Sequence, residues 1–292
     1  MNLLKDVHRF FTNNRGIVRI DTFHFEIVTG CQLRCIGCPN STLQPTVRHI
    51  SPDDFSRCLT NVDVGSVRFL RLYNYGEPFL HPELAALLPV VTRQSWSAEQ
   101  VEISTNAMIY DEQLLREIIR SRVVTHLVVS CDGDGTPKEF ERLRPPATWA
   151  RLMTFLTGAS RLKQEFNSSI TLMTRTICTT EEGRERWRTL LTPLGWVPEF
   201  REWNLLPNTS HTPWNRKAHV SNHVCWPLQG FNLFVNCRGE VVPCCAYPGL
   251  APLGNLKTHM FSEIFRGADR KRFINHLRTS RRRDRICSQC EQ

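Results

Sequence analysis

Residues 23–38 read F-H-F-E-I-V-T-G-C-Q-L-R-C-I-G-C, and they contain the two features that decide the fold. The segment 23–29 is a short apolar run rich in aromatic and β-branched residues, which predicts a buried β-strand. Three cysteines follow within one loop, Cys31, Cys35 and Cys38. Three thiolates this close can bind one soft metal centre and leave a fourth position open. A zinc ion completed by a histidine is the alternative for the cysteines alone.

Similar apolar runs recur downstream and alternate with helical patterns. We expect further strands at 67–73, 100–104, 125–130, 169–176 and 197–203, and helices near 51–62, 81–93, 111–121, 148–164 and 181–193. The first helix has a clear start, because Ser51 can cap it and Pro52 suits its first turn. With 23–29, these six strand–helix units predict an α/β protein with a partial (β/α)6 TIM-like barrel.

Polar motifs stand at the carboxyl ends of the predicted strands. After the second, third and fourth strands these residues are Gly76-Glu77-Pro78, Ser104 and Asn106, and Ser130 and Asp132. In a β/α barrel the carboxyl ends of the strands meet at one rim, where the chemistry takes place. We therefore expect the cysteine loop and these motifs to surround one site.

The order of these motifs resembles that of the radical S-adenosylmethionine superfamily, which carries a C-x3-C-x2-C loop after the first strand of a six-unit β/α barrel. The resemblance covers residues 22 to about 203. It implies that Cys31, Cys35 and Cys38 hold three irons of a 4Fe-4S cluster. The amino and carboxylate groups of S-adenosylmethionine would chelate the fourth iron, and reduction would cleave this cofactor to methionine and a 5'-deoxyadenosyl radical.

The resemblance also assigns cofactor contacts along the rim. Gly76-Glu77-Pro78 is similar to the family's G-E-P motif, whose backbone and acidic side chain receive the cofactor's ammonium group. An ammonium needs acceptors, and a glycine lets the backbone come close. By position, Ser104 and Asn106 match contacts to the ribose or carboxylate, Ser130 and Asp132 match ribose contacts, and Arg144 matches an arginine that pairs with the carboxylate.

One position departs from the family pattern. Many relatives place an aromatic residue directly before the third cysteine, where it packs on adenine, and this chain has Gly37 there. We expect the adenine to be packed from elsewhere, with Ile36 as the candidate.

Six of the twelve cysteines lie near the C-terminus, between Cys225 and Cys290. From about residue 205 the sequence becomes rich in Pro, Asn, Thr and Ser, which indicates a domain boundary. The tail resembles the SPASM and twitch extensions of the superfamily, which carry auxiliary 4Fe-4S clusters. The resemblance implies one such cluster on four thiolates, those of Cys225, Cys244, Cys287 and Cys290. Cys245 could replace Cys244, and zinc would also suit four thiolates.

The chain therefore divides into three segments: a helical lead-in over 1–21, the core barrel over 22–204, and a small C-terminal cysteine-rich auxiliary-cluster domain over 205–292. The N-terminal residues are charged throughout and do not form a signal peptide, and no run approaches the ~18 apolar residues of a membrane span. We expect a cytoplasmic protein with reduced thiols and no membrane partner.

The chain has a net charge of +9, and its positive residues are most concentrated in four arginines just before Cys287, at positions 281–283 and 285. Interleaved aromatic residues would favour a nucleic-acid-binding surface, and this run has none. We expect these arginines to lie at a solvated helix end; alternatively, they balance the charge of an anionic iron–sulfur cluster. We expect no nucleic acid partner.

The motifs leave the reaction open, because one barrel serves many reactions. The resemblance points to relatives that oxidise or epimerise aminocyclitols and amino sugars, or that modify peptides and sulfatases. Only about 20 residues precede the first strand. A separate N-terminal peptide-recognition domain is not expected, which favours a small polar substrate over a peptide or protein. A non-catalytic iron–sulfur electron-transfer module is a third possibility.

The fate of the substrate radical distinguishes oxidation from epimerisation. Oxidation needs an electron acceptor, which the tail cluster could be, whereas epimerisation needs a thiol hydrogen donor, for which Cys245 and Cys237 are the candidates. We favour oxidation. A donor such as flavodoxin or ferredoxin would supply the initial electron. The side chains expected to face the substrate are Arg175, Glu199, Glu202 and His223.

Overall fold

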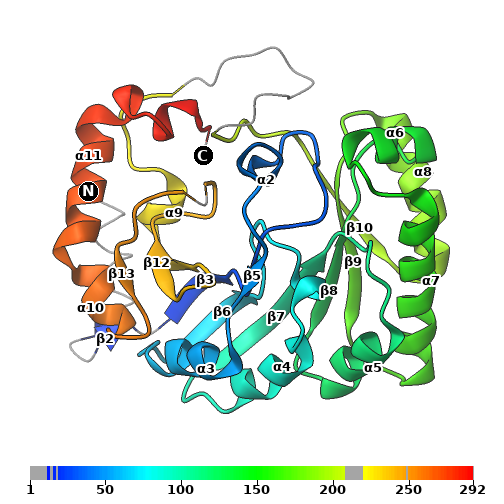
Figure 1. The fold of residues 1–292 in the computed structure, drawn as a ribbon, viewed down its shortest axis with the longest axis horizontal. Coiled ribbons are helices and arrows are strands. Elements are labelled where there is room, and N and C mark those ends of the chain that lie inside the picture. Colours follow the sequence, from blue (N-terminus) through cyan, green and yellow to red (C-terminus); the bar gives the residue numbers. More distant parts are fainter. Residues whose placement is uncertain (1–11, 14–15, 18, 208–219, 248, 292) are drawn as a thin grey trace.

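Six parallel strands form the barrel wall, in the order β3-β6-β7-β8-β9-β10 (Figure 1). They are β3 (Arg19–Phe25), β6 (Ser66–Arg71), β7 (Ser97–Thr105), β8 (His126–Ser130), β9 (Thr171–Ile177) and β10 (Val197–Arg201). The computed structural model describes residues 12–13, 16–17, 19–207, 220–247 and 249–291. Since each strand pairs in parallel with the one before it, every connection must cross back over the sheet. The predicted partial (β/α)6 barrel is confirmed.

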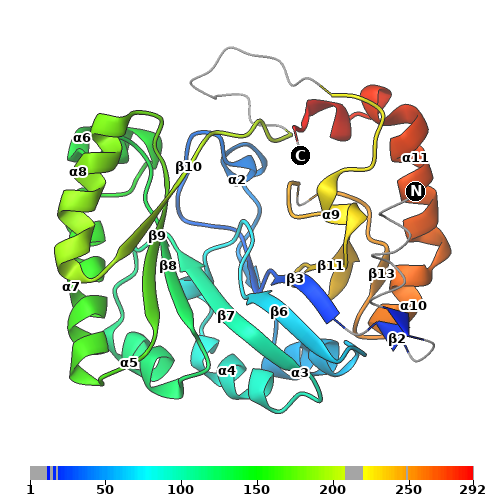
Figure 2. The same cartoon turned by 180° about the vertical axis from the view of Figure 1, so that it is seen from behind.

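Helices on the outer face of the sheet make these crossings (Figure 2). They are α3 (Pro52–Thr60), α4 (Leu84–Thr92), α5 (Glu112–Ser121), α7 (Trp149–Glu165) and α8 (Glu181–Leu191). Each was predicted, and Ser51 caps α3 by accepting the N–H of Asp54 at 3.2 Å. Two short helices, α2 (Pro39–Leu43) and α6 (Pro137–Leu143), were not predicted, because segments of this length show little periodicity. No helix in the described ranges is long and apolar enough to cross a bilayer.

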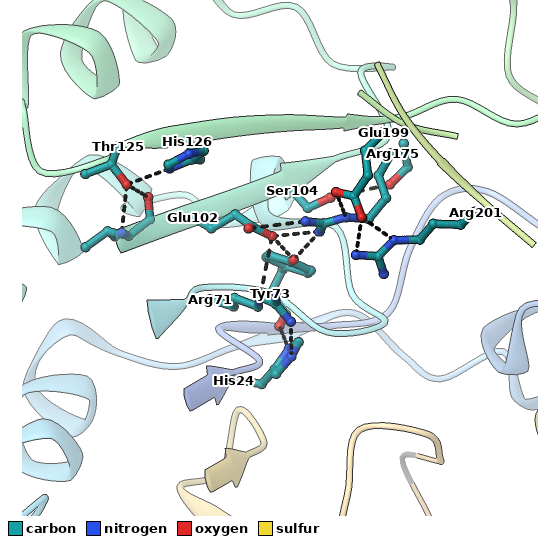
Figure 3. Close-up of polar contacts among 12 residues, drawn as sticks. His24, Arg71, Tyr73, Glu102, Ser104, Thr125, His126, Arg175, Glu199 and Arg201 are labelled. Atoms are coloured by element: carbon teal, nitrogen blue, oxygen red, sulfur yellow. Dashed lines mark hydrogen bonds and ion pairs between the residues drawn. The ribbon is translucent and has the colours of Figure 1, made fainter. Parts of the chain in front are cut away.

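Strand residues alternate between an apolar outer face and a polar inner face. Outer-face residues that pack beneath the helices and are at most 1% exposed include Phe23, Leu70, Ile103, Leu127 and Leu172. Residues of the same strands that alternate with them onto the inner face include His24, Arg71, Glu102, His126 and Arg175 (Figure 3). The core therefore lies between sheet and helices, and the inside of the barrel is polar.

A helical lead-in was expected over residues 1–21, but the described part of this segment forms β-strands. β1 (Thr12–Asn13) and β2 (Gly16–Ile17) pair as an antiparallel hairpin, and β3 already begins at Arg19. Asn and Gly, which flank the connection, favour tight turns and disfavour helices. The helical expectation is wrong for the described part of this segment, and residues 1–11 lie outside that part.

The strand predicted at 23–29 is divided in two. β3 ends at Phe25, and β4 (Val28–Thr29) pairs with β5 (Arg48–His49) in a separate two-stranded sheet. Between them the buried carboxylate of Glu26 accepts the backbone N–H of Tyr75 at 3.2 Å. This contact with the chain beyond β6 accompanies the break in the strand.

The tail continues the barrel sheet. β11 (Asn232–Val235) pairs in parallel with β3. β12 (Glu240–Val242) pairs antiparallel with β11, and β13 (Gly254–Asn255) pairs antiparallel with β12, at the edge of the same nine-stranded sheet. The short α9 (Trp226–Gln229) precedes β11, and α10 (Phe261–Arg266) and α11 (Ala268–Ser280) follow β13 (Figure 1). Phe265 of α10 stacks on Phe231, with ring centroids 5.2 Å apart, and both belong to the main core. Since this core also contains barrel residues such as Phe23, the tail packs directly on the barrel.

Candidate active site

Cys31, Cys35 and Cys38 lie in the loop between β4 and α2 and line one cavity. The loop after β8 supports them: the backbone N–H of Ile36 donates to the carbonyl of Leu143 at 2.8 Å, and that of Arg34 to Pro145 at 2.6 Å. Leu143 is the last residue of α6, so this short helix positions the cysteine loop. The protein chain itself holds the three thiols around a common space.

The thiols suit an iron–sulfur cluster. Burial raises the pKa of all three, that of Cys35 to about 12. They become thiolate ligands only beside a positive charge such as that of iron. Among the residues described, no three His, Cys, Asp or Glu side chains form a group that could hold a single metal ion. A cubane does not need such a group, because each thiolate binds a different iron.

The cavity has a volume of about 330 Å³, and nearly all the predicted cofactor-binding residues line it. They are Gly76, Glu77, Ser104, Asn106, Ser130, Asp132 and Arg144. Pro78 does not line it, but starts the buried turn behind it, η1 (Pro78–Leu80). The tertiary structure therefore brings the rim motifs to the cysteine loop, as the sequence predicted.

Gly76 packs against the chain at Val28, and Glu77 is hydrogen-bonded to the segment at the end of β7. A Cβ atom on Gly76 would lie 1.6 Å from the carbonyl oxygen of Val28, so only glycine fits there. The buried carboxylate of Glu77 accepts the hydroxyl of Thr105 at 2.6 Å and the backbone N–H of Asn106 at 2.8 Å. Burial raises its pKa, while these hydrogen bonds act in the opposite direction. Glu77 thus positions the segment that contains Asn106.

Arg144 and Asp132 form a buried ion pair on the cavity wall. The other carboxylate oxygen of Asp132 accepts the N–H of Ile177 at 3.0 Å. The Nε atom of Arg144 is buried and makes no hydrogen bond to any described residue. An unsatisfied buried donor is costly, so it favours an acceptor group of a ligand in this cavity. This fits the predicted pairing with the cofactor's carboxylate.

The polar atoms of the neighbouring rim residues converge as well. The amide Nδ2 of Asn106 lies 3.4 Å from the Cys31 sulfur. The hydroxyls of Ser104 and Ser130, from adjacent strands, are also 3.4 Å apart. These side chains form a polar wall beside the thiols.

The indole ring of Trp203 lies beside Gly37. A Cβ on Gly37 would lie 2.7 Å from Cζ3 of Trp203, a residue that follows β10 and lines the cavity. Ile36, the residue expected to pack on adenine, lines the cavity too. The sequence analysis missed Trp203, because nothing near Gly37 in the sequence points to it.

The inner wall of the barrel carries a charged network (Figure 3). Arg175 donates to the carboxylate of Glu102 at 2.7 and 3.3 Å and to the phenol oxygen of Tyr73 at 2.6 Å, and the Tyr73 hydroxyl donates to Glu102. Burial alone would raise the pKa of Glu102, but Arg175 and Arg71 lower it to about 2. Glu102 is therefore an anion that fixes Arg175 and Tyr73, both of which line the cavity.

Glu199 and His24 extend this network (Figure 3). Toward the rim, Glu199 accepts from Arg175 at 3.2 Å and from Arg201 at 2.6 Å. Toward the tail, His24 Nε2 lies 3.2 Å from Arg71 Nη1, an atom that can only donate, so Nδ1 carries the proton that is donated to the carbonyl of Tyr73. Burial and then Arg71 lower the pKa of His24 to about 3.

Of the four side chains expected to face the substrate, Arg175 lines the cavity and Glu199 pairs with it. Glu202 is exposed and is absent from the described lining. His223 lies in the tail, where its ring contacts Ser221 and Arg281. Arg281 itself is only 2% exposed, so the expected solvated run holds for Arg282, Arg283 and Arg285 alone.

The tail cysteines gather in a second set. Mutual electrostatic interactions connect the thiols of Cys225, Cys244, Cys245, Cys287 and Cys290. This set contains the four predicted ligands and the alternative, Cys245. Its donors are all soft sulfurs, which fits a second iron–sulfur cluster. Burial raises the pKa of the Cys225, Cys244, Cys245 and Cys287 thiols, that of Cys287 to about 12.

Cys237 stands apart from both sets. It lines a separate cavity of about 240 Å³ with Glu26 and Thr29, and its sulfur is 3.1 Å from the Thr29 hydroxyl. Neither Cys237 nor Cys245 is among the described residues that line the main cavity. The two candidate hydrogen donors are therefore not brought to the site.

Comparisons with known proteins agree with this geometry. Residues 25–182 match the family model described as the radical SAM superfamily, and residues 225–291 match the SPASM model, described as an iron-sulfur cluster-binding domain. Comparison with curated protein sequences gives no match.

Several solved structures share the fold. BtrN in complex with AdoMet and 2-DOIA is 14% identical with a TM-score of 0.54, covering 94% of this chain and 93% of BtrN. AnSMEcpe with bound AdoMet is 12% identical with a TM-score of 0.61, covering 92% and 88%. Streptococcus suis SuiB bound to its precursor peptide SuiA is 12% identical with a TM-score of 0.58, covering 98% of this chain and 73% of SuiB.

Proposed function

The chain belongs to the radical S-adenosylmethionine superfamily, and we propose that it oxidises a small polar substrate such as an aminocyclitol or amino sugar. It binds S-adenosylmethionine, a 4Fe-4S cluster and an auxiliary 4Fe-4S cluster. When bound and reduced, these groups supply a 5'-deoxyadenosyl radical that takes a hydrogen atom from the substrate. An electron donor such as flavodoxin or ferredoxin starts the turnover.

The geometry of the site supports the following assignment of the residues that hold these groups. Cys31, Cys35 and Cys38 bind the first cluster. Gly76, Asn106 and the free Nε of Arg144 receive the amino acid part of the cofactor, and Ser104 and Ser130 face its ribose. Trp203 supplies the aromatic surface that Gly37 lacks. The auxiliary cluster takes Cys225, Cys244, Cys287 and Cys290, with Cys245 as the alternative to Cys244.

The residues of the inner cavity wall are the main support for the proposed class of substrate. Tyr73, Arg175 and Arg201 line the cavity, and Glu102 and Glu199 hold the guanidinium groups in place. Fixed N–H and O–H donors beside carboxylates suit the hydroxyl and amino groups of a small polar molecule. They position such a substrate without a rearrangement of the barrel.

Oxidation is favoured over epimerisation by the placement of the thiols. Apart from Cys31, Cys35 and Cys38, no cysteine is among the described residues lining the cavity, so a thiol hydrogen donor is missing from it. Tyr75 links the cavity to the second cysteine set, which would serve as the electron acceptor site, because it lines the cavity and its hydroxyl donates to the carbonyl of Ala246, next to Cys245. The likeness to BtrN over nearly its whole length supports a small substrate.

Peptide modification is the second candidate, because anSMEcpe has been solved with the bound Cp18Cys peptide and its TM-score is 0.61. To distinguish the two, anaerobically reconstituted protein is offered aminocyclitols, amino sugars and cysteine- or serine-containing peptides, and the products are analysed by mass spectrometry. We expect a small-molecule product two mass units lighter than its substrate. A modified peptide with no change in any small molecule would refute the proposal.

A further inference from the structure

Tyr75 connects the two cysteine sets. It lies between the end of β6 and Gly76, and its hydroxyl donates to the carbonyl of Ala246 at 2.7 Å, directly after Cys244 and Cys245 in the chain. Its own carbonyl accepts the side-chain amide of Asn40 at 2.9 Å, two residues after Cys38. One residue is thus bonded to the segment after each set of thiols.

The backbone of Tyr75 is held firmly. Its N–H donates to the buried carboxylate of Glu26 at 3.2 Å. The next residue, Gly76, is pressed against the carbonyl of Val28, where a Cβ would lie at 1.6 Å. Since the backbone is fixed against β4 and its neighbourhood, the phenol projects from a rigid base toward the tail.

We propose that Tyr75 is a positioning residue that holds the segment 244–246 against the Cys31–Cys38 loop and so sets the separation of the two clusters. This inference rests on the auxiliary cluster of the proposed function, but not on the identity of the substrate. A fixed separation matters because an electron that leaves the substrate must reach the auxiliary cluster.

Two substitutions test this role. Tyr75→Phe keeps the ring and removes only the hydrogen bond to Ala246, whereas Tyr75→Leu removes both. The control is Tyr110→Phe, which removes a hydroxyl bonded to Glu112, far from either cysteine set in the sequence and absent from the described cavity lining. Iron content and the dipolar coupling between the two reduced clusters, measured by pulsed electron paramagnetic resonance, are compared in reconstituted full-length protein.

We expect Tyr75→Phe to retain ~8 iron per chain but to show a weaker or more broadly distributed coupling. Tyr75→Leu should lose the auxiliary cluster and keep ~4 iron together with S-adenosylmethionine binding. The control should match wild type.

Coupling and iron content unchanged in both Tyr75 variants would overturn the positioning role and leave the proposed function standing. Loss of the first cluster with retention of the auxiliary one would overturn it as well. If wild-type protein holds only one cluster, the inference fails together with the auxiliary cluster on which it rests.

Discussion

Arg175 on β9 donates two hydrogen bonds to the carboxylate of Glu102 on β7, at 2.7 and 3.3 Å, across the intervening strand β8 (Figure 3). Both side chains lie on the inner face of the barrel, where their pairing compensates the charge of each. Arg175 of this ion pair lines the proposed substrate cavity, and Glu102 holds it in place.

Glu102→Gln should therefore destabilise the protein, because it leaves Arg175 and Arg71 buried with less compensating charge. We expect the free energy of unfolding to fall by about 3 kcal/mol, the scale for a broken buried pair. The folded pKa of Glu102 is about 2, below its ordinary value of 4.5, so its contribution is complete above pH 4.5 and is lost as the pH falls toward 2. Urea denaturation at pH 8 and pH 6 should give the same difference from wild type.

The exposed Glu185→Gln is the matched control, since its ion pair with Arg188 lies at the surface. It should change stability by less than about 0.5 kcal/mol. A Glu102 effect as small as this would contradict the structural importance of the network.

His24 should make wild-type stability fall below pH 6.5. Its folded pKa is about 3 and its ordinary value is 6.5, so between these values the unfolded chain binds one proton more than the folded chain. Wild type should lose about 1 kcal/mol more than His24→Gln between pH 6.5 and 5.5, as measured by urea denaturation. The exposed His259→Gln should behave like wild type, and equal slopes for wild type and His24→Gln would show that His24 is not held neutral.

Two cysteine sets predict two cubanes, hence ~8 iron and ~8 sulfide per reconstituted chain. Changing Cys31, Cys35 and Cys38 together to Ala should leave about half the iron and abolish cofactor cleavage. Cys178→Ala, a buried thiol outside both sets, is the control and should retain all the iron. Zinc in the tail, with iron for only one cluster, would disprove the two-cluster assignment.

The rim residues should affect cofactor binding without affecting iron. Asn106→Ala is expected to weaken S-adenosylmethionine binding about 10-fold in equilibrium dialysis, the effect of losing one hydrogen bond to a charged group. Glu77→Ala should weaken it at least as much, since the backbone of Asn106 loses its acceptor. Iron content should stay near wild type, and the exposed Gln113→Ala should bind normally. Unchanged binding in both rim variants would refute their cofactor roles.

The spare thiols separate oxidation from epimerisation. If the protein oxidises its substrate, Cys245→Ala and Cys237→Ala should still form a product two mass units lighter, without carbon-bound deuterium in heavy water. A product of unchanged mass that gains one deuterium in heavy water, and that is lost in either variant, would identify an epimerase. Cys58→Ala removes a buried core thiol and controls for loss of a sulfhydryl alone.

Much of the fold is encoded locally and was predictable. The six barrel strands and five crossover helices each show their own periodicity over a few turns or pleats, and residues such as Ser51 mark their starts. The meeting of Glu77, Asn106 and Asp132 with the cysteine loop was also predictable, because parallel strands bring their carboxyl ends to one rim whatever their exact bounds.

The sequence by itself therefore determined the barrel, its reactive rim and the chemistry of its thiols. Only the tertiary structure decided that Trp203 lies beside Gly37, that β11 extends the sheet beyond β3, that Cys237 contacts Thr29, and that Tyr75 is bonded to Ala246 and Asn40. Each of these is a contact between side chains or strands far apart along the chain. Local periodicity reports which face of a helix or strand is buried, but the partner that buries it is selected by the packing of the whole molecule.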